Sequence, residues 1–191
     1  MRWLTLYARS RQVPASVAVI VLSALTVGFL APGGGAGPGD LRLPALALAA
    51  GATAASAGLG GQDPALDRTA ALRWVYRRAV HVLLIGAVAG AALLSAQALG
   101  EHMAPVAFLA RDSAGLAGLV AAATAVWGAR NAWILPTGWL AFALFAPAAT
   151  SVPLQVGTWM LLPPGTTAAT WTAVALALVG TAAYAVAGPR R

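Results

Sequence analysis

Residues 77–99 read RRAVHVLLIGAVAGAALLSAQAL, two arginines followed by an apolar run without a further charge. A helix rises about 1.5 Å per residue, so the run 79–99 is long enough to cross a hydrocarbon core of about 30 Å. Glu101 and His102 close the run on its far side. The stretch therefore predicts a transmembrane helix that carries arginines at one end only.

Five further apolar runs accompany it. The run 112–127 is slightly short for a crossing, but the apolar residues 105–110 before it can extend the helix outward. The run 43–59 is rich in alanine and glycine, and small faces let helices approach closely, so we expect this helix to be buried among the others. The five runs cover residues 14–31, 43–59, 112–127, 132–145 and 168–187.

The composition supports a membrane protein. Hydrophobic residues make up 60% of the 191 residues and charged residues only 9%, whereas a soluble globular chain is about 25% charged. A chain of this size cannot enclose so much apolar surface, so lipid must be part of its solvent. We predict an all-α, polytopic membrane protein, with residues 1–191 forming one transmembrane domain of six helices.

The arginines predict its orientation. All twelve basic residues are arginine, and with Met1 inside only Arg42 and Arg111 would face out. Basic residues near membrane crossings prefer the cytoplasmic side, so both termini are predicted to be cytoplasmic. The ten arginines on that side are Arg2, Arg9, Arg11, Arg68, Arg73, Arg77, Arg78, Arg130, Arg190 and Arg191.

Two segments outside the crossings are expected to lie at the membrane surface. Residues 1–12 mix arginine with aromatic rings, which predicts an interfacial helix anchored by Trp3, Tyr7 and Arg9, although a plain basic flank to the first crossing explains the mix equally well. Residues 146–167 are apolar but broken by prolines, and they are too short to cross. They predict short re-entrant or interfacial pieces on the external side.

Signatures of catalysis and ion coupling are missing. The five acidic residues all fall in predicted loops or at helix ends, so no buried ion path is expected. His81 and His102 lie on opposite sides of a crossing and cannot share a metal. The chain has no cysteine and no lysine, which excludes thiolate metal sites and a phosphate-binding loop. We therefore expect neither an enzyme nor a metal or cofactor, and the bordering arginines argue against a nucleic-acid partner.

Residues 63–78 form the most informative polar segment. Asp63 followed by Pro64 is a good helix start, with Asp67 early and the arginines late, as the helix dipole favours. This predicts a short amphipathic cytoplasmic helix. One interpretation is a basic flank to the next crossing, and the other is a docking element for a cytoplasmic partner. The residues assigned to docking are Asp67, Arg68, Arg73, Trp74 and Arg77.

The layout resembles the permease subunit of an ABC-2-type ATP-binding-cassette exporter, here from a high-GC bacterium. That family has an interfacial N-terminal helix, similar to residues 1–12, and six crossings with both termini inside. It has a cytoplasmic coupling helix between crossings two and three, similar to residues 63–78, and broken external helices between crossings five and six, similar to residues 146–167.

The resemblance implies partners and a mechanism. A separate ATPase subunit would supply energy through the coupling helix, and a second permease chain, identical or homologous, would complete the path across the bacterial plasma membrane. An apolar path would suit an amphiphilic or hydrophobic cargo or a peptide. Two other functions stay open: a substrate-capture subunit of an energy-coupling-factor importer, for which Glu101, His102, Arg111 and Asp112 are the available polar cluster, and a non-transporting membrane scaffold.

Overall fold

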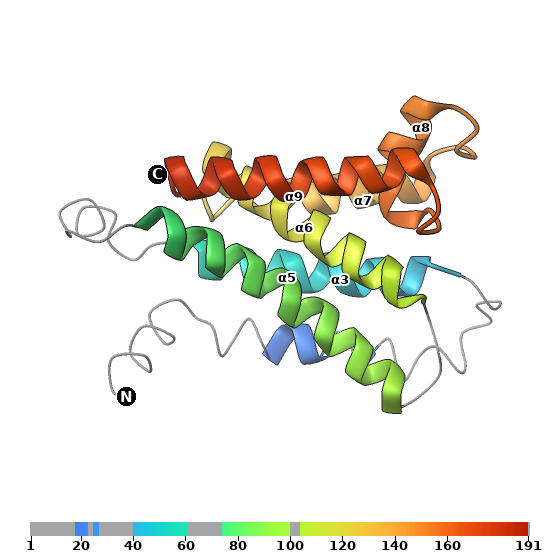
Figure 1. Cartoon of the computed structure of the whole chain (residues 1–191), viewed down its shortest axis with the longest axis horizontal. Coiled ribbons are helices and arrows are strands. Elements are labelled where there is room, and N and C mark those ends of the chain that lie inside the picture. The colour runs from blue at the N-terminus through green and yellow to red at the C-terminus, as the bar shows by residue number, and fades with distance from the viewer. Residues whose placement is uncertain (1–17, 23–24, 27–39, 61–73, 100–103, 191) are drawn as a thin grey trace.

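The computed structural model describes residues 18–22, 25–26, 40–60, 74–99 and 104–190. Across these ranges the regular structure is entirely helical, which confirms the all-α class (Figure 1). The elements are α3 (Arg42–Ala55), the 3-10 helix η1 (Ser56–Leu59), α5 (Trp74–Leu99), α6 (Val106–Trp127), α7 (Ile134–Phe145), α8 (Val152–Gly157), the 3-10 helix η2 (Trp159–Leu161) and α9 (Thr167–Ala187).

Three of these helices are long and apolar enough to cross a membrane, namely α5, α6 and α9. Helix α7 is apolar but shorter, and the predicted crossing 43–59 is made of α3 followed by η1. Most of the predicted crossing 14–31 lies outside the described residues, although Ile20 packs against α3, where a Cβ built on Gly51 would lie 3.2 Å from its Cγ1. The other five predicted helix positions agree with the structure, whereas a count of six crossings stays a prediction.

Helix α6 is the centre of the bundle, and it lies between α5 and α9 (Figure 1). In its most apolar window 67% of the residues are buried, against 28% in each of α5 and α9. The outward faces of the two flanking helices are apolar, with Leu83, Leu178 and Val179 each more than 60% exposed. Such faces suit a lipid environment, in which exposed apolar side chains need no protein cover.

The tightest packing joins α6 to α9 through two glycines. A Cβ built on Gly118 would lie 2.5 Å from the Ala177 Cα, and one built on Gly180 would overlap the carbonyl of Gly118. One turn away, a Cβ on Gly115 would lie 3.0 Å from the Ala173 Cβ. Small residues therefore let the two backbones touch, as in membrane helix pairs that associate by packing alone.

The expectation that the alanine-rich helix is buried is confirmed. Ala45, Ala49 and Ala52 of α3 are at most 2% exposed, and this face packs against α5, α6 and α7. The following 3-10 turn ends on a fully buried Leu59, whose carbonyl oxygen accepts a hydrogen bond of 2.7 Å from the hydroxyl of Tyr184. The end of η1 is thereby held at the C-terminal end of α9.

A tight turn connects α6 to α7. Gly128 has a φ of 80°, a conformation that glycine adopts without steric cost, and its N–H donates to the Thr124 carbonyl at 3.0 Å. The N–H of Asn131 then donates to the Gly128 carbonyl at 3.2 Å. The two helices therefore form a helical hairpin.

The segment 146–167 contains the two short helices α8 and η2. Proline near the start of α8 suits its first turn, and Pro163 and Pro164 follow η2 and cannot donate backbone hydrogen bonds. Figure 1 shows this segment projecting at one end of the bundle, beyond the start of α9. Re-entry of the segment into a membrane stays a prediction.

Candidate functional site

The structure reaches only part of the predicted docking helix. Asp67, Arg68 and Arg73 lie outside the described residues, as do the predicted interfacial anchors Trp3, Tyr7 and Arg9. Trp74 and Arg77 belong to the first turn of α5. The roles assigned to all of these residues stay predictions.

Residues 74–78 run directly into the long apolar helix. Helix α5 is continuous from Trp74 to Leu99, so Arg77 and Arg78 share one rigid rod with the apolar residues after Ala79. No glycine or proline occurs before Gly86 to kink this rod. A force applied at residues 74–78 would therefore move α5 without an intervening hinge.

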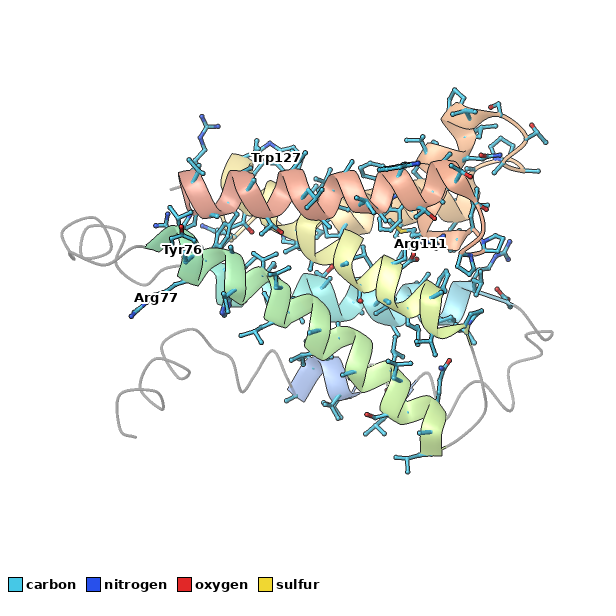
Figure 2. The ribbon with its side chains drawn as sticks, in the orientation of Figure 1. Tyr76, Arg77, Arg111 and Trp127 are labelled. Atoms are coloured by element: carbon cyan, nitrogen blue, oxygen red, sulfur yellow. The ribbon has the colours of Figure 1, made fainter. Side chains whose placement is uncertain are left out.

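One end of the bundle, which we call the Trp127 end, is rich in arginine. Figure 2 shows Tyr76, Arg77 and Trp127 at this end and Arg111 at the opposite one. The guanidinium of Arg78 covers the C-cap of α9, where a Cβ built on Gly188 would lie 2.7 Å from Nη1. Cations are favoured there because the last carbonyls of a helix carry partial negative charge.

Arg190 closes the adjacent C-terminus of α6. Its backbone N–H donates to the Thr124 carbonyl at 3.3 Å, and its Nη1 donates to the Val126 carbonyl at 3.1 Å. The Val126 carbonyl is one of the last four of α6, which have no partner within the helix, whereas the Thr124 carbonyl also accepts from the Gly128 N–H. The structure describes two acidic residues: Asp40 lies just before α3, and Asp112 lies near the start of α6. The described part of the Trp127 end therefore carries only positive charge.

At the opposite end, Arg111 holds the segment 146–167 against α6. Its Nη1 donates to the Pro163 carbonyl at 3.1 Å, and its Nη2 donates to the carbonyls of Leu162 at 2.7 Å and Trp159 at 3.1 Å. Its Nε donates to Oδ1 of Asp112 at 2.7 Å, and the two side chains are 6% and 0% exposed. We call this cluster the Arg111 clamp.

The local sequence explains why an arginine is needed here. Pro163 and Pro164 remove two N–H donors, and the 3-10 geometry of η2 makes poorer hydrogen bonds than an α-helix. Arginine carries five donors in a planar fork, so a single side chain can bond three carbonyls and one carboxylate oxygen. The guanidinium also lies 5.3 Å from the ring centroid of Phe108, one turn earlier in α6.

Trp159 completes the contact by packing into α6. Its side chain is fully buried, and its ring lies over Gly115, where a Cβ would be 2.6 Å from the ring carbon Cη2. Met160 beside it is also fully buried. The segment is therefore joined to α6 by apolar packing as well as by the Arg111 clamp.

The expectation that every acidic residue lies in a loop or at a helix end is wrong for Asp112. Helix α6 starts at Val106, as the apolar residues 105–110 allow, which places Arg111 and Asp112 in its second turn and buries the carboxylate. A buried carboxylate is tolerated because its neighbour supplies the counter-charge. The carbonyls that hold Arg111 come from about fifty residues later, and no local sequence signal reveals them.

The clamp has a structural rather than a chemical character. The donors of Arg111 are directed at backbone carbonyls and at Asp112, so the guanidinium does not open on a pocket. Within the described ranges, no group of three or more side chains could hold a metal ion. Trp159 was not among the predicted site residues, and Arg111 and Asp112 were named only in the polar cluster of the capture-subunit alternative.

Comparison with known proteins adds no relative. No family model matches the chain, and neither a curated protein nor a solved structure matches it. The two ends of the bundle are the features that bear on function. One end is rich in arginine, and the other carries the segment 146–167, which the Arg111 clamp holds.

Proposed function

We propose that this chain is the permease subunit of an ATP-driven, ABC-2-type exporter in a bacterial plasma membrane. One observation carries the proposal: two short broken helices stand between α7 and α9 at the end of the bundle opposite Arg77. A broken, apolar segment clamped at one end and an arginine-rich surface at the other match the external and cytoplasmic features of that class.

The proposed mechanism starts at residues 63–78. A separate ATPase would grip this segment, and its movement would pass into α5 because residues 74–78 continue into that helix without a hinge. Arg78 lies against the C-cap of α9, which gives the movement a second route. The close crossing at Gly118 and Gly180 joins α9 to α6, so both could shift together as one rigid body relative to a second permease chain.

The proposed topology has six crossings with the Trp127 end in the cytoplasm, following the preference of arginine for that side. Because the chain has no cysteine, single substitutions report topology cleanly. In intact cells, a membrane-impermeant maleimide should label Ala36→Cys and Val156→Cys but not Ala70→Cys, which should react only after the membrane is opened. Labelling of Ala70→Cys in intact cells would show that the orientation is the opposite of the proposed one.

Charge reversal tests the docking surface. Arg73→Glu combined with Arg77→Glu should weaken association with the partner ATPase roughly tenfold or more, because two attractive charges at the interface become repulsive. The measurement is co-purification with a candidate ATPase, followed by the rate of ATP hydrolysis in nanodiscs. Arg42→Glu is the matched control, since Arg42 is exposed on the first turn of α3, at the other end of the bundle.

The outcomes separate the candidate functions. A double variant that binds the ATPase and hydrolyses ATP like the wild type would show that residues 63–78 are not the coupling helix. A wild-type chain that binds no ATPase would exclude the exporter and leave the scaffold. The capture subunit is less well supported, because Arg111 and Asp112 are directed at each other and at the segment 146–167 rather than at a pocket.

A further inference from the structure

An apolar groove runs along α7 at the surface of the bundle. Its volume is about 410 Å³. Three aromatic side chains line it together with Ile134 and two glycines, and the indole N–H of Trp139 is already bonded to the Gly157 carbonyl at 2.8 Å, so this donor is satisfied within the protein. The lining includes Trp127, Ile134, Gly138, Trp139, Phe142 and Gly157.

The groove is open in its middle. A Cβ built on Gly138 would meet no atom within 4 Å, whereas one on Gly157 would lie 2.6 Å from the Phe142 ring. From Ile134 to Phe142 the helix rises about 12 Å, at about 1.5 Å per residue. That is close to the depth of one leaflet, about half of a 30 Å hydrocarbon core.

Two arginines flank Trp127, one of them three residues later in the chain and the other bonded to the residue before it. Arg130 is exposed in the turn between α6 and α7, and Arg190 is held beside Trp127 by its bond to the Val126 carbonyl. That bond uses one of the five guanidinium donors of Arg190. Tryptophan is enriched at the headgroup level of membranes, so Trp127 (Figure 2) marks the depth at which a phosphate would meet these arginines.

We propose that this groove binds one anionic phospholipid, with an acyl chain along α7 and the headgroup phosphate on Arg130 and Arg190. The positive charge of the site favours an anionic headgroup, because the two acidic residues that the structure describes, Asp40 and Asp112, lie towards the opposite end. The apolar lining favours an acyl chain, and the length of the groove is close to the depth of one leaflet. A single amphiphile satisfies both halves, whereas a second protein helix would leave the arginines without a counter-charge.

The test is lipid retention in nanodiscs that contain equal parts of phosphatidylglycerol and phosphatidylcholine. Full-length protein is extracted in mild detergent, and the phosphatidylglycerol that stays bound is counted by native mass spectrometry. Wild type should retain it in preference to phosphatidylcholine. Arg130→Gln and Arg190→Gln should each lower that retention about fivefold, the effect of one arginine on an anionic headgroup.

Gly138→Leu separates a groove from general surface attraction. The leucine fills the open middle of the groove and should abolish retention, while Gly165→Leu, also placed where nothing lies within 4 Å, should leave it unchanged. Ile134→Trp fills the same groove from an exposed position and replaces Gly138→Leu if that variant fails to fold.

Three results would overturn the proposal: equal retention in all variants, loss in the arginine variants with retention intact in both groove-filling variants, or a second protein chain on the groove in place of lipid. The proposal does not depend on the exporter function, since retention is measured without an ATPase.

Discussion

Replacing Arg111 by methionine should lower the free energy of unfolding by about 3–5 kcal/mol, the cost of leaving one partner of a buried ion pair uncompensated. Asp112 is fully buried, and Oδ1 would lose the donor that lies 2.7 Å away. The carbonyls of Trp159, Leu162 and Pro163 would lose the same guanidinium. The measurement is chemical or thermal unfolding of the purified protein in detergent.

The position of the segment 146–167 gives a second readout of the same change. Without the Arg111 clamp, this segment should become accessible to protease at temperatures where the bundle is still helical by circular dichroism. Arg111→Lys keeps the charge but not the planar fork, so it should recover only part of the stability. The double variant Arg111→Met/Asp112→Leu should be more stable than Arg111→Met, because it removes the orphaned carboxylate. Equal stability of Arg111→Met and wild type would contradict the clamp.

Gly180→Ala should lower the free energy of unfolding by about 3 kcal/mol, the upper end of the usual cost of overpacking. The added methyl group would overlap the backbone carbonyl of Gly118, which cannot move aside as a flexible side chain can. Gly118→Ala meets the backbone of Leu176 and Ala177 and should cost a similar amount. Either change requires α6 and α9 to shift relative to each other.

Two glycines provide the controls for this crossing. Gly138 and Gly165 have no atom within 4 Å of a built Cβ, so alanine at either position should change stability by less than about 1 kcal/mol. Unfolding of all four alanine variants under one condition tests the difference. If Gly180→Ala matches Gly138→Ala, the helices do not meet at their backbones and the proposed joint movement of α6 and α9 loses its basis.

Much of the fold could be predicted because a membrane acts on local sequence. A helix that faces lipid needs a run of about twenty apolar residues, and such a run can be recognised without knowing its neighbours. The run 168–187 accordingly became α9, and the alanine-rich run 43–59 became the buried α3 with η1.

The candidate sites were less predictable, because the contacts that form them involve backbone atoms. The sequence placed Arg111 only on the outer side and in a polar cluster, because its partners beyond Asp112 are backbone carbonyls, which every residue has and which carry no sequence signature. Gly118 and Gly180 are two among twenty-one glycines, and only their meeting distinguishes them.

The amino-acid sequence by itself determined the helical class, the positions of the apolar helices and the unequal distribution of arginine, because hydrophobicity and charge act residue by residue on the choice between lipid and water. Only the tertiary structure decided that α6 is the core, that Arg111 fastens a segment about fifty residues away, and that α7 carries a groove ending at Trp127. Those features depend on which surfaces meet, and the free energy of that meeting belongs to pairs of residues rather than to either residue alone.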